Sequence, residues 1–344
     1  MPIYTHKNQE IQFPKDSEFF ISIAKIGFHS FLMLGVMEVD TPKILARIGK
    51  LALETAAYKL VGKAVCKFAK ARIMDEGIGR KETYSPSMSY QAYSITLKQY
   101  HEFLELIAKI EHDQKHNLNT YIPIMCYVPD MSSGEQITFR YQEIDPLVPK
   151  NNESKMEAIS IHANEIKLTN NCRSTAREIM EYILAGVAER ISAFFGFELN
   201  YQSTLPAGQP DKATFYVLPP PPASSVRASD PKIGMVLEKL YAKLEKIPKV
   251  STDSIATRKK FNAIKSLYKQ LAGNQKALTA AELLTTISEY CRNHQEDLYA
   301  HRENGLKKFL GWETDTRLLF RTITNLLNEI EVKETQCKTS MTLI

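Results

Sequence analysis

Four consecutive prolines, Pro219–Pro222, constrain the fold of this chain more than any other feature. Proline lacks a backbone N–H and fixes φ, so such a run continues neither a helix nor a central strand. Together with the Ser/Ala-rich residues that follow, it predicts a stiff, extended connector over 219–230. A chain of 344 residues is long enough for two domains. We therefore predict one domain over 1–218, a second over 231–335 and a flexible tail over 336–344.

The residues before the prolines mix strand and helix patterns. Residues 28–39 (FHSFLMLGVMEV) are apolar on both faces, which is typical of a buried strand. Residues 90–95 (YQAYSI) alternate like a strand, and Thr96 can cap a helix that begins at Leu97. Short strands are also expected at the segments IPIMCYV, QITFRY and EAISI. These patterns predict an α+β domain.

Helical periodicity dominates the rest of the chain. An apolar stripe follows Cys172 and predicts a helix that begins there; its members are Ala176, Ile179, Met180, Ile183, Leu184, Val187 and Ile191. After the prolines, four segments carry helix-spaced apolar residues. Thr279 with Glu282 fits a capping box, and Gly273 suits a helix C-terminus. We predict a bundle of about four helices for the second domain.

Composition excludes several classes of protein. No apolar run reaches the roughly 20 residues that span a bilayer, so no transmembrane segment is expected. A net charge of +5 without basic blocks does not indicate nucleic-acid binding. The five scattered cysteines include no CxxC pair, which argues against disulfides and against a metal site. The first residues lack the pattern of a secretory signal, and we expect neither a metal nor another cofactor.

Cys172 is the candidate nucleophile. A helix N-terminus supplies unpaired N–H groups and a partial positive charge, which lower the pKa of a thiol. Cys172 follows Asn170 and Asn171, either of which can cap the helix. The alternative is a structural role, because Cys172 lies in register with the apolar stripe and free cysteine is commonly buried.

A thiol nucleophile needs an imidazole from another part of the fold. His29 is the best placed of the eight histidines, because it begins the apolar strand 28–39. The alternative for His29 is a structural histidine at the edge of the core. His162, close to Cys172 in the sequence, is the second candidate for the base.

The order of these segments carries a resemblance. An early GFHSFLMLG strand, a middle SYQAYSIT strand leading into a helix, and a late LTNNCRSTAREIMEYIL helix resemble circularly permuted papain-like enzymes of the NlpC/P60 and LRAT type over roughly residues 20–200. The resemblance implies a papain-like fold with a small antiparallel sheet, in which His29 and Cys172 form the catalytic pair. It also implies thiol hydrolase or acyltransferase activity on a peptide, isopeptide or amide, with the backbone N–H groups of Cys172 and Arg173 as the oxyanion site.

The third catalytic position departs from the family pattern. Permuted members place a polar residue on the strand after the histidine, where this chain offers only Arg47 and Lys50. The nearby acids Glu38 and Asp40 are the candidates for this position. Gly77 and Gly79 in MDEGIGRKE match no nucleotide-binding fingerprint and indicate a turn.

The chain is similar, more narrowly, to Legionella Dot/Icm-type effector proteins that share the YQAYSIT, NNCRSTA and YVLPPPP elements. That resemblance implies delivery by type IV secretion into the host cytoplasm, a role in virulence and a host protein as substrate. Three alternatives stay open. The first alternative is that the domain is an inactive scaffold that binds a host protein or membrane. The second is a lipid-modifying enzyme, which requires an apolar tunnel beside Cys172. The basic stretch Lys59–Arg72 is either a packed amphipathic helix or a peripheral membrane contact.

Overall fold

The computed structural model describes residues 9–38, 41–53, 68–77, 87–118, 122–130, 135–144, 153–167, 169–204, 215–225, 230–250, 254–274, 278–299 and 315–342. These residues form a mixed α/β chain with antiparallel sheets. The chain divides into two compact units, Met1–Val217 and Leu218–Ile344. The division falls one residue before the end of the first predicted domain.

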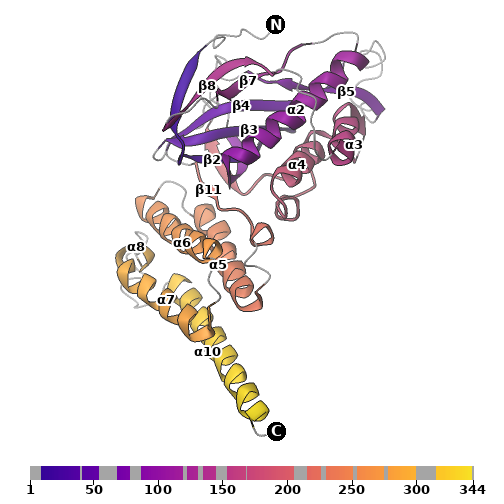
Figure 1. Cartoon of the computed structure of the whole chain (residues 1–344). Coiled ribbons are helices and arrows are strands. Elements are labelled where there is room, and N and C mark those ends of the chain that lie inside the picture. The colour runs from indigo at the N-terminus through magenta and orange to yellow at the C-terminus, as the bar shows by residue number, and fades with distance from the viewer. Residues whose placement is uncertain are drawn as a thin grey trace. The chain divides into compact units, whose positions relative to one another are not determined.

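An eight-stranded sheet forms the centre of the first unit (Figure 1). Seven of its strands lie in the order β10-β6-β2-β3-β4-β5-β9, and β11 pairs with β6. Their bounds are β2 Glu18–Ile26, β3 His29–Glu38, β4 Thr41–Ala52, β5 Phe68–Asp75, β6 Ser87–Ile95, β9 Glu165–Lys167, β10 Tyr201–Thr204 and β11 Val217–Leu218. All registers recorded between neighbouring strands are antiparallel. The sheet is therefore larger than the small sheet that the sequence predicts.

A second sheet packs beside it in the order β1-β8-β7, built from β1 Glu10–Pro14, β7 Met125–Asp130 and β8 Gln136–Glu143. Its Phe139 contacts the rings of Phe19 and Tyr100 at 5.9 and 6.0 Å. Tyr100 also donates a hydrogen bond to the carbonyl of Tyr127 (2.7 Å). These contacts join the second sheet to the large sheet and to the helix that carries Tyr100.

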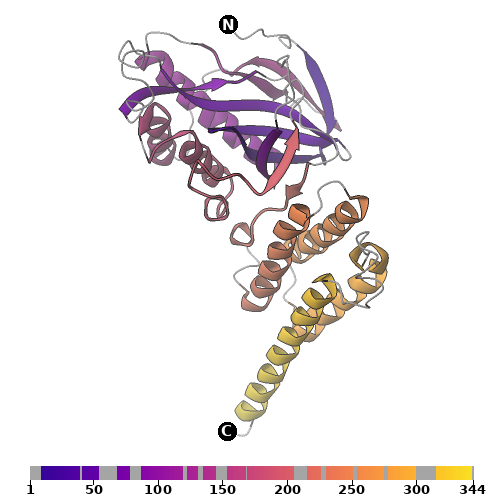
Figure 2. The same ribbon diagram turned by 180° about the vertical axis from the view of Figure 1, so that it is seen from behind.

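Three helices accompany the large sheet: α2 Leu97–Asn117, α3 Glu153–Ala163 and α4 Cys172–Ile183. Seen from behind, the strands lie in front of α2 (Figure 2). Thr96 caps α2 through a capping box with Gln99, as the sequence predicts. Helix α4 packs on β2, β3 and β4. This contact brings the start of α4 to the middle of the sheet.

The predicted strand EAISI is wrong, because these residues lie in α3. Met156, Ile159, Ser160 and Ala163 are buried, and their spacing is that of one helix face. The β-branched isoleucines favour a strand locally. Packing of this face against α2 and α4 outweighs that preference.

Two further predictions are corrected. Helix α4 ends at Ile183 and not at Ile191, because Glu181 accepts hydrogen bonds from the N–H groups of Gly186 and Ala188 (both 2.8 Å) and holds a turn there. The basic stretch Lys59–Arg72 is not one helix, because residues 68–72 belong to β5, where the chain pairs with β4. Residues 59–67 of that stretch lie outside the described residues.

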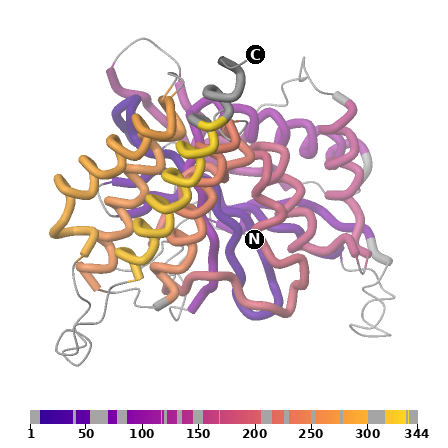
Figure 3. Tube along the Cα trace, turned by 90° about the horizontal axis from the view of Figure 1, so that it is seen from below, coloured from indigo at the N-terminus to yellow at the C-terminus, as the bar shows by residue number. Residues whose placement is uncertain are grey.

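The second unit is helical, with α5 Pro231–Val250, α6 Ile255–Gly273, α7 Ala280–Asn293, α8 Gln295–Tyr299 and α10 Asp315–Thr342. Helix α5 packs against α6 and α10, and α7 packs against α10 (Figure 3). The predicted capping box of Thr279 and Glu282 is present at α7. Helix α10 continues to Thr342, so the predicted flexible tail is helical over most of its length.

The proline run is not a free connector. Pro219, Pro221 and Pro222 are buried. Tyr241 donates a hydrogen bond to the carbonyl of Pro219 (3.0 Å), and Tyr268 donates to that of Pro220 (2.8 Å). The carbonyls of Pro221 and Pro222 accept from the N–H groups of Ser224 and Ser225 (2.9 and 2.8 Å), so all four proline carbonyls have a partner. The prolines are thus part of the helical unit.

No helix in the described part of the chain is both long and apolar enough to cross a membrane.

Replacing Thr96 tests whether its side chain fixes the start of α2. Thr96→Ala removes the hydroxyl that accepts from the Gln99 N–H (3.2 Å), and it should lower the free energy of unfolding by about 1 kcal/mol. Thr96→Ser keeps the hydroxyl and should retain most of that stability. Urea denaturation of the two variants and the native protein measures the difference. Equal stability of the alanine and serine variants would contradict the role of the cap.

Candidate active site

Cys172 is the first residue of α4, and its position is fixed by the residue before it. Asn171 is the N-cap, and its Oδ1 accepts hydrogen bonds from the N–H groups of Arg173 (2.9 Å) and Ser174 (3.1 Å). In return, the Asn171 N–H donates a hydrogen bond to Ser174 Oγ (2.8 Å). Cys172, a residue of intermediate exposure, therefore lies at the positive end of the helix dipole.

His29 is the first residue of β3 and follows a two-residue turn. Gly27 has φ of +57°, a conformation that other residues rarely adopt, and this lets Ile26 pair with His29 across the turn. The next N–H in the strand, that of Ser30, donates to Cys172 Sγ (3.4 Å). The start of β3 and the start of α4 thus meet at the thiol.

The structure brings His29 and Cys172 together. Cys172 Sγ lies at the start of β3, 3.4 Å from the Ser30 backbone nitrogen and 4.0 Å from the Phe28 carbonyl oxygen, and it interacts there with His29. His29 Nε2 contacts Glu76 Oε1. With Nε2 engaged by the carboxylate, Nδ1 is the ring nitrogen that is available to another partner. The carboxylate holds the ring in one orientation. The three side chains are arranged as nucleophile, base and orienting acid.

The charges in this group favour an imidazolium and a thiolate. Burial acts to lower the pKa of His29, but hydrogen bonds and charge interactions with Cys172 and Glu76 raise it to about 10. Burial acts to raise the pKa of Cys172, and the hydrogen bonds from His29 and the Ser30 N–H outweigh it, so that the thiol pKa is lowered. A thiolate is the nucleophilic form of cysteine.

Glu76 follows β5 and reaches His29 across β4. Its N–H donates to the carbonyl of Arg47 (2.9 Å), which holds the residue beside β4. The next residue, Gly77, has φ of +82°, and its N–H donates to Asp75 Oδ1 (2.7 Å). The turn after β5 therefore aims the Glu76 side chain back over the sheet.

Gly49 of β4 makes room for this contact. A Cβ atom at position 49 would collide with the Glu76 carboxylate and come within 3.0 Å of His29 Nε2. Gly49 pairs with Phe31 on β3 and with Met74 on β5, so it lies between the two catalytic candidates. A side chain at this position would separate histidine from acid.

Arg47 and Phe31 complete the surroundings of the pair. Arg47 Nε lies 3.9 Å from Glu76 Oε2, and its guanidinium lies over the Phe31 ring, 4.7 Å from the centroid. The His29 ring stacks on the same phenylalanine, with the centroids of His29 and Phe31 5.8 Å apart. The side chains of His29 and Glu76 are 31% and 11% exposed, so the pair is shielded from solvent while the imidazole remains accessible.

The acids predicted for the third position are not the ones found there. Glu38 is exposed at the opposite end of β3 from His29, which excludes contact between them. Asp40 lies outside the described residues. Glu76 was missed because its segment indicated only a turn. In the sequence, the one indication was that Glu76 directly precedes Gly77. Linking Glu76 to His29 requires the register of β3, β4 and β5.

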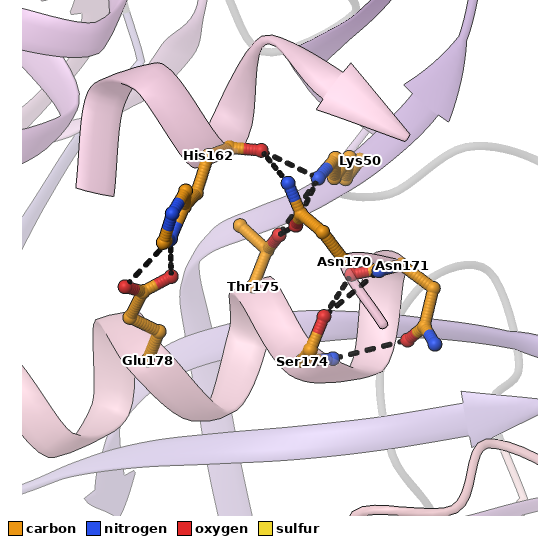
Figure 4. Close-up of polar contacts among 7 residues, drawn as sticks. All are labelled: Lys50, His162, Asn170, Asn171, Ser174, Thr175 and Glu178. Atoms are coloured by element: carbon orange, nitrogen blue, oxygen red, sulfur yellow. Dashed lines mark hydrogen bonds and ion pairs between the residues drawn. The ribbon is translucent and has the colours of Figure 1, made fainter. Parts of the chain in front are cut away.

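His162, the alternative base, is occupied elsewhere. Its Nδ1 contacts the Glu178 carboxylate on α4 at 3.0 and 3.1 Å, and its backbone carbonyl accepts from Lys50 Nζ (2.7 Å) (Figure 4). The structure thus gives His162 a role in joining α3 to α4.

Lys50 is a buried cation beneath the first turn of α4. Its Nζ donates to Asn170 Oδ1 (2.8 Å), Thr175 Oγ1 (2.9 Å) and the carbonyl of His162, as Figure 4 shows. Burial lowers the pKa of Lys50 to about 8, and the charge of Cys172 acts against that change. The lysine therefore anchors the loop that leads into Cys172 and adds positive charge near the thiolate.

The two predicted oxyanion donors differ in availability. The Arg173 N–H donates to the capping Asn171, so it is already engaged. The Arg173 side chain is fully buried and donates to Ser30 Oγ (2.9 Å), Ser192 O (3.2 Å) and Phe197 O (3.0 Å). The N–H of Cys172, at the first position of the helix, is the better donor to a developing oxyanion.

In the described part of the chain, no group of three or more His, Cys, Asp or Glu side chains is arranged to hold a metal ion. Comparison with known proteins gives no match to a protein-family model, to a curated protein or to a solved structure. The family resemblance of the sequence therefore remains a hypothesis.

Glu76→Gln should raise the apparent pKa of the Cys172 thiol, because it removes the negative charge that stabilises the His29 imidazolium. The loss of one adjacent charge corresponds to a shift of about 1 pKa unit or more. The pH dependence of Cys172 alkylation measures the thiol, and NMR titration measures the imidazole. Glu38→Gln, at the exposed end of the same strand, is the matched control and should change neither value. An unchanged thiol pKa in Glu76→Gln would contradict the orienting role.

Gly49→Ala should separate His29 from Glu76, because the added methyl group occupies the space of their contact. We expect a thiol pKa close to that of Glu76→Gln. Gly273→Ala is the control, since a methyl group there meets nothing within 4 Å. A Gly49→Ala protein whose thiol titrates as in the native chain would show that β4 does not need a glycine here.

Proposed function

We propose that the first unit is a cysteine-dependent acyl-transfer enzyme. The observation that carries the proposal is the chain of contacts from Glu76 through His29 to the helix-opening Cys172. A carboxylate, an imidazole and a thiol in this order activate a nucleophile in many unrelated enzymes.

The reaction follows from these groups. The Cys172 thiolate attacks the carbonyl carbon of an amide, forming an S–C bond, while the Cys172 N–H stabilises the oxyanion. The His29 imidazolium then gives its proton to the leaving nitrogen as the C–N bond breaks. Water attacks the resulting thioester with His29 as general base, which releases the acid and restores the thiol. Another acceptor in place of water gives transacylation.

We further propose that the unit is a circularly permuted papain-like domain of the NlpC/P60 type. A histidine at the start of a strand precedes, in the chain, a cysteine at the start of a helix packed on the sheet, and this order supports the assignment. The orienting acid departs from the family pattern, since Glu76 comes from beyond β5 and crosses a glycine of the strand after the histidine.

The rival function, an inactive scaffold that binds a host protein or membrane, expects a thiol sealed in the core with His29 turned away. Cys172 is a residue of intermediate exposure that lies at the start of β3 and interacts with His29, and these observations argue for the enzyme instead. The resemblance to Dot/Icm-type effectors supports a host protein as substrate and delivery into the host cytoplasm by type IV secretion. It is the sole support for both.

The alkylation rate of Cys172 by iodoacetamide, measured across pH, tests the activated pair. The native chain should react with an apparent pKa below the free-thiol value of about 8.5. His29→Ala should move the apparent pKa above that of the native chain, because burial then acts on the thiol without a compensating cation. Peptide mass spectrometry assigns the modified residue, and Cys291 is the internal comparison, since burial raises its pKa to about 11.

A second readout tests acyl transfer itself. With p-nitrophenyl acetate, the native chain should release a burst of p-nitrophenol and carry an acetyl group on Cys172, and Cys172→Ser should do neither. A slow, pH-insensitive alkylation that ignores His29, with no acetylated Cys172, would overturn the proposed function.

A further inference from the structure

Four phenylalanines lie together on the first unit and form what we call the aromatic patch: Phe28, Phe194, Phe195 and Phe197. The ring centroids of Phe28 and Phe195 are 6.5 Å apart, those of Phe194 and Phe195 are 5.2 Å apart, and those of Phe194 and Phe197 are 4.9 Å apart. Two segments that are distant in the sequence, the β2–β3 turn and residues 194–197, thus build one apolar surface.

The aromatic patch is unusually exposed. Phe28, Phe194 and Phe197 are 77%, 54% and 62% exposed. Among the described residues with exposed large apolar side chains, all the phenylalanines belong to this patch. Scattered single apolar side chains on a surface need no explanation, whereas a contiguous group of them marks a binding surface.

The patch adjoins the nucleophile. The carbonyl oxygen of Phe28 lies 4.0 Å from Cys172 Sγ, and Phe28 directly precedes His29. The other side of the patch is tied to the residue after the nucleophile, because the buried Arg173 donates to the carbonyls of Ser192 and Phe197. The patch is therefore held in a fixed position next to the thiol.

Two charged side chains next to the patch, those of Glu198 and Arg173, have partners within the protein. Glu198, the residue after Phe197, contacts Lys25 Nζ. Arg173 spends its donors on Ser30 and on the segment 192–197. These contacts favour an uncharged apolar group over an ionic one at this surface.

We propose that the aromatic patch is a substrate subsite, which binds an aromatic or large aliphatic group next to the carbonyl that Cys172 attacks. The inference rests on the proposed function for the chemistry at Cys172 and adds the substrate class: amides or peptides with a large apolar group beside the scissile bond. Aromatic rings bind such groups by burial of area and by edge or offset ring contacts.

Two alkylating probes test the subsite. Iodoacetamide carries no apolar group, and N-benzyl-2-iodoacetamide carries a benzyl ring. In both reactions the thiolate forms an S–C bond and iodide leaves, so the ratio of their rates at Cys172 cancels the activation of the thiol. Free cysteine gives the reference ratio. The native chain should favour the benzyl probe by about ten-fold over this reference, since about 1.4 kcal/mol corresponds to a factor of ten.

The double variant Phe194→Ser/Phe197→Ser should bring the ratio to that of free cysteine and leave the iodoacetamide rate unchanged. Both side chains are exposed, so folding should tolerate their loss. Ile255→Ser removes an apolar side chain of similar exposure (76%) from the helical unit and should keep the native ratio. A native ratio equal to that of free cysteine, or one that survives the double variant, would overturn the subsite.

The two proposals fail separately in this experiment. Slow iodoacetamide labelling that ignores His29 counts against the enzyme, whereas fast labelling without benzyl preference counts against the subsite alone. Sedimentation with phosphatidylcholine vesicles tests a membrane as the occupant. Membrane docking would replace the subsite if the native chain binds vesicles, the double variant does not, and the two proteins have the same ratio of probe rates.

Discussion

The buried guanidinium of Arg173 is the contact on which the site depends. A buried cation without partners would cost several kcal/mol, and Arg173 satisfies its donors with Ser30, Ser192 and Phe197. These partners come from three places: the start of β3, and two points in the segment after α4. Because the residues beside them include His29, Cys172 and the aromatic patch, one buried side chain fixes the base, the nucleophile and the neighbouring surface together.

A second buried cation, Lys50, also fixes the start of α4. Lys50 gathers Asn170, Thr175 and the carbonyl of His162, so the loop before Cys172 and the first turn of the helix share one anchor. Both cations also lie near a thiolate that the imidazolium stabilises. The start of α4 is thus a region of positive potential built from a helix dipole, two buried cations and a histidine. Glu76 balances this charge from the far side of the imidazole.

Glu76, the third member of the proposed catalytic group, illustrates how a sheet can assemble a site. His29, Gly49 and Glu76 belong to β3, to β4 and to the turn after β5. Gly49 on β4 has no side chain to block the contact, and Glu76 after β5 supplies the acid. The strand after His29 offers no acid, and Glu76, which follows the next strand β5, contacts the histidine instead. The second unit has its own core, and the proline run packs onto its tyrosines.

The sequence by itself determined the features that a window of about ten residues contains. Thr96 and Thr279 mark helix starts through their capping partners, the apolar run before Glu38 is a strand, and Cys172 opens a helix because a capping asparagine precedes it and an apolar stripe follows. Only the tertiary structure decided that Glu76 orients His29, that EAISI is helical, that α4 ends at Ile183 and that the phenylalanines of two segments share one surface. Each of these depends on strand register or on helix packing between residues far apart in the chain, where local preference gives no direction.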